Sequence, residues 1–295
     1  MNYLEKNKDI TGLSNYRTPA RAQYFFELKN RQDIDKLFEI IQWANKEELP
    51  VLFISGGTNM LFAFDTYEGV VIQNSLKWWT YDIDTKILDT YGSESIWKIA
   101  ETLEETYGQN LWHRFIGLPW SIAGAIYWNA GCFGLETENN FIECEVLNLD
   151  TGELSLFKKD DMNFSYRNSK LKEEKKYFLI SAKFDLSKKI EKYHSDIDNI
   201  DFRENKQPKG NSCGSFFKNP NREQSAGYLI EQVGLKWYSL GWAYFSQKHA
   251  NFLMHNGQGT YKDMLELIEL AQDKVKDKFN ICLLYTSDAA DDLLC

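Results

Sequence analysis

Stretches patterned as helix alternate with stretches patterned as strand through the first hundred residues. Residues 31–48 place apolar side chains on one face at helical spacing, namely Ile34, Leu37, Phe38 and Ile41. Pro50 ends that pattern, and the apolar run VLFI after it is typical of a buried strand. The runs GVVIQN and ILDTYG predict two more strands, and Ser95 is placed to cap a second amphipathic helix. This alternation predicts a mixed α and β domain.

The rest of the chain predicts a hairpin, a further strand and a separate helical unit. FIECEVLNLDTGELSLFKK alternates around a DTG turn, as a hairpin does, and KYFLISAKFDL predicts another strand. Ser225 can begin a short helix that Gly234 ends. Thr260 and Asp263 form a capping box before the last helix, whose predicted apolar face is Met264, Leu267, Ile268, Ala271 and Val275.

A polar, charged stretch separates these two parts of the chain. It begins near residue 190 and is the best candidate for an interdomain linker. We therefore predict an α+β protein with one unit at residues 1–188, a linker at residues 189–205 and a second unit at residues 206–281.

Composition and charge narrow the class of protein. The 295 residues include 43% hydrophobic and 15% aromatic residues, which suits an ordered protein with a sizeable core. The net charge of -9 argues against a nucleic-acid surface, which needs clustered Lys and Arg. The charged N-terminus lacks a signal segment, and no apolar run is long enough to cross a membrane. The cysteine and histidine spacings lack metal-site patterns, so we expect a reduced cytoplasmic protein without a structural metal.

Two consecutive glycines follow the first predicted strand, in VLFISGGTNML. Glycine lacks the Cβ that would block a close approach, so Gly56 and Gly57 can bring backbone N–H groups to a phosphate. A tight turn requires the same residues, and the motif is neither G-x-G-x-x-G nor a Walker loop. By itself the motif leaves both interpretations open.

Three further segments contain candidate binding or catalytic residues. GLPWSIAGAIYWNAG suits either close helix–strand packing or a flat cofactor. In FSYRNSK, Arg167 can bind an anion bidentately or form a surface ion pair. In NSCGSFFKNP, Ser215 precedes two aromatic residues, but the segment lacks the nucleophile elbow of a serine hydrolase. Each segment alone leaves its function open.

Six segments occur in a specific order: SGGTNML, GLPWSIAGAIYWNAGCFG, SYRNS, CGSFFKNP, AGYLIEQVGLK and KHANFLMHN. In this order they resemble the UDP-N-acetylenolpyruvoylglucosamine reductase family, from about residue 12 to residue 281. The resemblance implies a vanillyl-alcohol-oxidase-type FAD-binding domain followed by a smaller α+β substrate-binding domain. It also implies FAD and NADPH as cofactors. The implied reaction reduces the enolpyruvyl group of a UDP-sugar and gives UDP-N-acetylmuramate for peptidoglycan synthesis.

The resemblance also implies roles for individual residues. The FAD-binding residues would be Ser55, Gly56, Gly57, Thr58, Asn59, Gly117, Pro119, Ser121, Gly124, Asn129 and Gly131. The substrate-binding residues would be Tyr166, Lys218 and Asn219. Arg167 would stabilise an enolate, because charge that develops beside a carboxylate needs a fixed cation. Ser215 would protonate that enolate, which is basic enough to take a proton from a weak acid.

The end of the chain departs from the family pattern. The family's third catalytic residue, a glutamate in a C-terminal strand, should stand at Thr286. The run CLLYTSDAAD can be encoded by DNA that resembles a transposase adapter used in short-read library preparation. We therefore expect residues 282–295 to be a non-native, adapter-derived tail and the catalytic glutamate to be missing. Two alternatives stay open: another FAD-dependent oxidoreductase of this fold, or a catalytically inactive flavin-binding protein.

Overall fold

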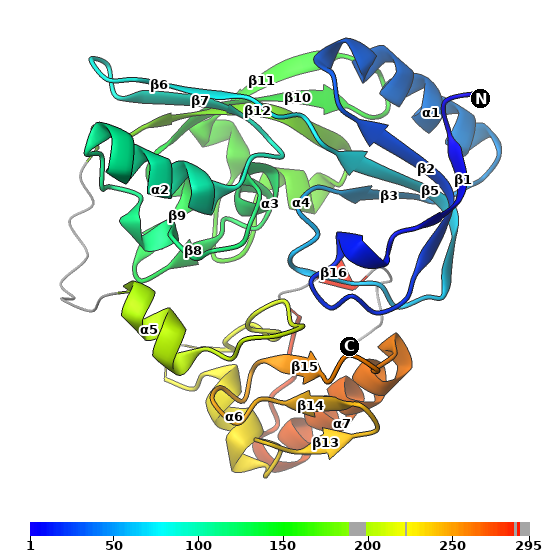
Figure 1. The fold of residues 1–295 in the computed structure, drawn as a ribbon, viewed down its shortest axis with the longest axis vertical. Helices are drawn as coiled ribbons and strands as arrows, with labels where there is room; N and C mark the ends of the chain where they lie inside the picture. Colours follow the sequence, from blue (N-terminus) through cyan, green and yellow to red (C-terminus); the bar gives the residue numbers. More distant parts are fainter. Residues whose placement is uncertain (189–198, 222, 286–287, 290–295) are drawn as a thin grey trace. The chain divides into compact units, whose positions relative to one another are not determined.

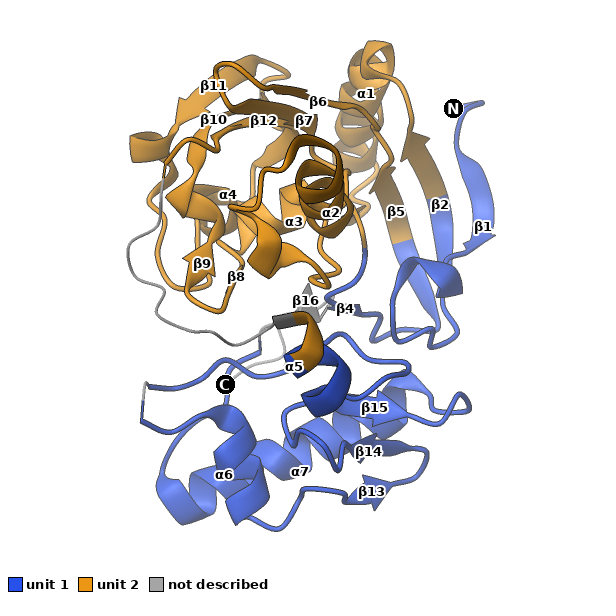
Figure 2. Cartoon of the chain, turned by 60° about the vertical axis from the view of Figure 1, so that its left-hand side comes forward, with its two compact units in different colours: residues 1–24, 57–68, 202–295 blue, residues 25–56, 69–201 orange. Residues whose placement is uncertain are grey.

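The structure of the chain is a computed structural model that describes residues 1–188, 199–221, 223–285 and 288–289. It contains two compact units, each assembled from segments that are far apart in sequence (Figure 2). Unit 1 consists of residues 1–24, 57–68 and 202–295, and unit 2 consists of residues 25–56 and 69–201. Because these segments interleave, the units do not coincide with the contiguous domains expected from the sequence, and the functional division of the chain stays a prediction.

A five-stranded antiparallel sheet forms the main part of unit 2. Its strands lie in the order β11-β10-β12-β7-β6 and are β6 (Trp79–Asp82), β7 (Ile87–Tyr91), β10 (Phe141–Asn148), β11 (Leu154–Lys158) and β12 (Tyr177–Asp185). β10 and β11 confirm the predicted hairpin, with Val146 paired to Ser155. β12 confirms the strand predicted from the alternating pattern after the hairpin.

Three helices lie on one face of this sheet (Figure 1): α2 (Ile96–Tyr107), α3 (Ile122–Tyr127) and α4 (Lys170–Glu174). Apolar side chains of these helices and of the strands form one buried core, which includes Leu88, Ile99, Ala125, Phe141 and Phe184. Ser95 caps α2 as predicted, because its Oγ accepts a 3.3 Å hydrogen bond from the Lys98 N–H. The Ser95 cap thus marks where α2 begins.

A four-stranded sheet contains the strand that precedes the glycine loop. Its order is β1-β2-β5-β3, with β1 (Glu5–Asp9), β2 (Arg21–Leu28), β3 (Val51–Ile54) and β5 (Thr66–Asn74). Helix α1 (Ile34–Lys46) connects β2 to β3 and buries Ile34, Leu37 and Ile41 of the predicted face, together with Ile40 and Ala44, whereas Phe38 is only half-buried. β3 and β5 are parallel, with Val51 opposite Val70. The connection between these two parallel strands contains the glycine loop and β4 (Met60–Leu61).

Unit 1 contains a three-stranded antiparallel sheet and two helices. The elements are β13 (Ser239–Leu240), β14 (Ala243–Phe245), β15 (Leu253–His255), α6 (Ala226–Gln232) and α7 (Tyr261–Phe279). The capping box of α7 is confirmed, since Asp263 N–H donates to Thr260 Oγ1 at 3.3 Å and Thr260 N–H donates to Asp263 Oδ2 at 2.8 Å. The buried side chains of α7 are those predicted from the apolar pattern.

Shorter elements complete the described chain. They are the 3-10 turns η1 (Thr11–Leu13), η2 (Arg31–Asp33), η3 (His113–Phe115), η4 (Thr137–Asn139) and η5 (Lys159–Met162), and the strands β8 (Gly131–Cys132), β9 (Leu135–Glu136) and β16 (Asp288–Ala289). Helix α5 (Asn199–Lys206) lies within the stretch predicted as a linker, whose residues 189–198 lie outside the described residues. No helix among the described residues is both long enough and apolar enough to span a membrane.

The first residues of the expected tail pack against the rest of unit 1. Leu283 is fully buried, and its carbonyl accepts a 2.9 Å hydrogen bond from Gln272 Nε2. Tyr285 pairs with Phe217 in an isolated antiparallel bridge. Position 286, where the family's glutamate is expected, lies outside the described residues, as do residues 290–295.

Candidate active site

The glycine loop, residues 55–59, follows β3 and contains an unpartnered polar atom. Gly57 has φ +60°, a left-handed conformation that glycine adopts without steric cost. The Ser55 hydroxyl is buried and has no hydrogen-bond partner among the described residues. Since a buried hydroxyl without a partner costs free energy, its natural complement is an acceptor on a bound ligand. This orphaned donor fits a phosphate oxygen of FAD, the ligand expected at this loop.

The second predicted FAD-binding segment runs from Gly117 into α3. Gly117 has φ +82°, and Ser121 caps α3 by accepting a 3.2 Å hydrogen bond from the Gly124 N–H. A Cβ on Gly124 would lie 3.3 Å from the Ser121 Oγ, so the cap is compact around this glycine. The structure therefore brings several predicted cofactor residues together at the start of α3.

The loop of residues 92–96, for which the sequence predicted only the helix cap Ser95, packs directly against this segment. The main chains are joined by hydrogen bonds from Ala123 N–H to the Gly92 carbonyl at 2.7 Å and from Ile122 N–H to the Glu94 carbonyl at 2.8 Å. Ser95 and Ser121, the caps of α2 and α3, form an antiparallel bridge. Gly92, directly after a predicted strand, is the sequence feature that could have indicated a close contact here. The segment that it contacts lies about thirty residues further along the chain, so no local pattern connects the two.

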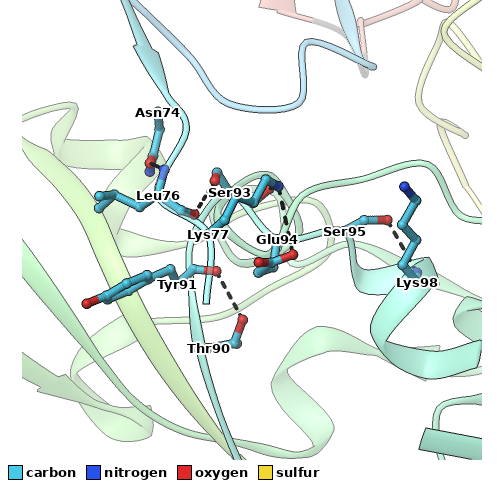
Figure 3. Close-up of polar contacts among 9 residues, drawn as sticks. All are labelled: Asn74, Leu76, Lys77, Thr90, Tyr91, Ser93, Glu94, Ser95 and Lys98. Atoms are coloured by element: carbon cyan, nitrogen blue, oxygen red, sulfur yellow. Dashed lines mark hydrogen bonds and ion pairs between the residues drawn. The ribbon is translucent and has the colours of Figure 1, made fainter. Parts of the chain in front are cut away.

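The residues that follow β5 hold this loop in place (Figure 3). The Ser93 hydroxyl donates to the Leu76 carbonyl, and the Lys77 ammonium donates to the Ser93 carbonyl. Lys77 also lies 3.9 Å from a Glu94 carboxylate oxygen. Partial burial lowers the pKa of Lys77, and Glu94 opposes that shift. Asn74 accepts a 3.1 Å hydrogen bond from the Leu76 N–H, so the support continues into β5.

Arg167 lies in a tight turn of unit 2 and is held by main-chain carbonyls. It has φ +57°, and its Nη2 donates to the Gly131 carbonyl at 2.8 Å and its Nη1 to the Asn129 carbonyl at 3.3 Å. Its guanidinium carbon lies 4.9 Å from the centre of the Tyr166 ring. The structure therefore brings four predicted site residues together. Because a guanidinium has five N–H donors, the two carbonyl bonds can orient it while others serve a ligand.

Ser215 belongs to unit 1, where the side chain of Asn251 organises its segment. Phe217 N–H donates to Asn251 Oδ1 at 2.9 Å, and Asn251 Nδ2 donates to the Phe217 carbonyl at 2.8 Å. Ser215 itself is exposed, whereas Phe216 and Phe217 are buried. Asn251, in the segment KHANFL, was missed as a positioning residue.

The other predicted residues of this segment have structural contacts of their own. The Asn219 side-chain oxygen accepts a 3.1 Å hydrogen bond from the Ala226 N–H at the start of α6. The Lys218 N–H donates to the Leu284 carbonyl at 2.7 Å. The His249 Nδ1 atom accepts a hydrogen bond from the Asn251 N–H at 3.2 Å, and burial lowers the pKa of His249.

Two protein families match the chain. A model described as "FAD binding domain" matches residues 26–156, and one described as "UDP-N-acetylenolpyruvoylglucosamine reductase, C-terminal domain" matches residues 206–285. These matches confirm the expected FAD-binding domain and the domain that follows it.

Known relatives match over most of the chain. The UDP-N-acetylenolpyruvoylglucosamine reductase of Acaryochloris marina is 32% identical over 93% of this chain and 88% of its own length. That of Fervidobacterium nodosum is 35% identical over the same shares. The crystal structure of the enzyme from Thermus caldophilus superposes with a TM-score of 0.76 at 22% identity, covers 97% of this chain and 98% of its own, and shows the same fold. The chain belongs to the UDP-N-acetylenolpyruvoylglucosamine reductase family.

Proposed function

We propose that this chain uses NADPH and FAD to reduce the enolpyruvyl group of UDP-N-acetylglucosamine enolpyruvate to UDP-N-acetylmuramate, in the cytoplasm. The main support for the proposed residue roles is that two main-chain carbonyls hold the guanidinium of Arg167. Its anchors, Asn129 and Gly131, end the segment expected to line the flavin. A cation fixed at this segment suits a substrate that bears a carboxylate and gains negative charge during reduction.

FAD would be held by the loop of residues 55–59 and by the start of α3. The buried Ser55 hydroxyl can donate to a phosphate oxygen, and Gly57 allows the main chain to approach it. When bound, FAD supplies hydride chemistry that no side chain provides. Loop 92–96 accepts hydrogen bonds from Ile122 and Ala123 and would therefore hold the start of α3 in position to bind FAD.

Arg167 and Ser215 would act on the substrate itself. Reduction at C3 leaves enolate character at C2, next to the substrate carboxylate, and the Arg167 guanidinium stabilises this charge. Ser215 then gives its proton to C2, which is basic enough to accept it from a hydroxyl. Tyr166, Lys218 and Asn219 would contact the UDP-sugar, and the Lys218 ammonium would suit its diphosphate.

An anaerobic flavin assay tests this function. NADPH should bleach the flavin absorbance of the FAD-loaded protein, and the enolpyruvyl UDP-sugar should restore it. Absence of bleaching would refute the reductase, and bleaching that any simple enone restores equally well would point to a different FAD-dependent oxidoreductase. A protein that binds FAD but neither bleaches nor responds to the sugar would be an inactive flavin-binding protein.

A further inference from the structure

Glu136 lies on the strand that pairs with the anchor of Arg167. In the ladder of β8 and β9, Gly131 is the partner of Glu136. Gly131 is also the residue whose carbonyl accepts the 2.8 Å hydrogen bond from Arg167 Nη2. A Cβ on Gly131 would lie 2.6 Å from the Glu136 Cγ, so the glycine allows the Glu136 side chain to cross the ladder. Gly131 is thus both the strand partner of Glu136 and an acceptor for the Arg167 guanidinium.

A second residue that contacts both Glu136 and Arg167 is Asn129, which is fully buried and has φ +40°. Its carbonyl accepts from Arg167 Nη1 at 3.3 Å, while its side-chain nitrogen lies 3.5 Å from Glu136 Oε2. The same nitrogen donates to Glu138 Oε1 at 3.0 Å and to the Ser165 carbonyl at 3.1 Å. Asn129 therefore links the turn that carries Arg167 to both carboxylates.

The charged groups around Glu136 come from three elements. Burial raises the pKa of Glu136, the Arg167 guanidinium opposes this shift, and the Glu138 carboxylate adds to it. Glu138 in turn lies 3.8 Å from the Lys159 ammonium, which balances its charge. Glu136 is thus the carboxylate whose charge is coupled to Arg167, whereas Glu138 has a cationic partner of its own.

We propose that Glu136 is a positioning residue for Arg167 and that its negative charge holds the guanidinium against the Asn129 and Gly131 carbonyls. The inference rests on the proposed role of Arg167. A cation with a fixed orientation stabilises developing charge better than one that must reorganise during the reaction. Ionised Glu136 supplies that fixed orientation before the substrate carboxylate arrives.

The test compares Glu136→Gln with Glu138→Gln. Glutamine keeps the shape and the accepting oxygen of Glu136, including its cap of the η4 turn, and removes only the charge. The readout is the rate at which the enolpyruvyl UDP-sugar reoxidises NADPH-reduced protein in a single turnover, at saturating sugar. We expect a drop of about tenfold for Glu136→Gln and little change for Glu138→Gln at neutral pH.

The pH profile separates positioning from a purely structural role. In the unmodified chain the rate should fall at acid pH as Glu136 is protonated and loses its hold on Arg167. Glu136→Gln should abolish this acid limb, and Glu138→Gln should move it to lower pH, because removal of a neighbouring negative charge lowers the pKa of Glu136.

Either of two results would overturn the inference. The first is an unchanged rate and acid limb in Glu136→Gln. The second is an equal loss of bound FAD in both variants, which would show that the carboxylates only support the fold. If the unmodified chain is itself not reoxidised by the sugar, the proposed function fails instead, so the two failures are distinguishable.

Discussion

Ser55 lies in the expected phosphate loop, and its buried hydroxyl has no hydrogen-bond partner in the described part of the chain. We predict that Ser55→Ala weakens FAD affinity about tenfold, because a hydrogen bond to a charged acceptor is lost. The same change should leave the FAD-free protein as stable as before or slightly more stable, since it removes an unsatisfied buried group. FAD titration and thermal unfolding measure the two effects. Ser14→Ala is the matched control, because Ser14 Oγ already donates to the Met60 carbonyl at 2.6 Å, and its loss should destabilise the FAD-free protein.

Arg167 depends on the planar geometry of its guanidinium, which bonds to two carbonyls at once. Arg167→Lys keeps the charge but cannot reproduce this geometry. We predict a loss of about 100-fold in sugar-dependent flavin reoxidation, with unchanged flavin reduction by NADPH. Arg31→Lys alters an exposed ion pair with Glu145 and should leave both rates unchanged. Equal slowing of both half-reactions by Arg167→Lys would contradict the assigned role.

Ser215 is exposed on a segment that Asn251 holds rigidly. We predict that Ser215→Ala slows product formation at least about 100-fold, because the enolate loses its proton donor. Sugar binding, followed by the shift in flavin absorbance, should change little. Ser212→Ala serves as the control for a nearby hydroxyl. A Ser215→Ala variant with the original rate would show that another acid protonates C2.

At the scale of elements, loop 92–96 packs tightly against its neighbours, which include α3. A Cβ at Gly92 would lie 2.8 Å from Leu179 Cδ2 and 3.2 Å from Ala123 Cβ. We therefore predict that Gly92→Ala lowers the free energy of unfolding by about 1–3 kcal/mol through overpacking and also weakens FAD binding. Gly12→Ala is the control in denaturant unfolding, because a Cβ there meets nothing within 4 Å. Equal free energies of unfolding for the two variants would contradict the claim that Gly92 is closely packed.

Elements set by local pattern could be predicted from the sequence, whereas contacts between distant segments could not. The capping box and buried face of α7 follow from residues within one helix, and the β10–β11 hairpin follows from one turn. Nothing local reveals that loop 92–96 pairs with residues 120–123, or that Asn251 organises Phe217. The resemblance predicts roles for Arg167 and Ser215, but the residues that support them could be found only in the structure.

At the scale of the whole molecule, each of the two compact units is assembled from segments that are far apart in sequence. Residues 1–24 and 57–68 belong with the C-terminal segment, and Ser14 and Met60 are joined by a hydrogen bond within unit 1. Contacts between segments so far apart in sequence cannot be predicted from a local sequence pattern. The two family matches, in contrast, each cover one contiguous stretch of the chain, residues 26–156 and residues 206–285.

The most direct test of the central claim is the proton NMR spectrum, together with the mass, of the product made from the enolpyruvyl UDP-sugar with NADPH in D₂O. The account predicts UDP-N-acetylmuramate with a solvent-derived deuteron at C2, because the proton that C2 receives comes from an exchangeable hydroxyl. Arg167→Lys and Ser215→Ala should give the same product more slowly. Unchanged substrate, or a product without deuterium at C2, would contradict reduction through an enolate that a side chain protonates.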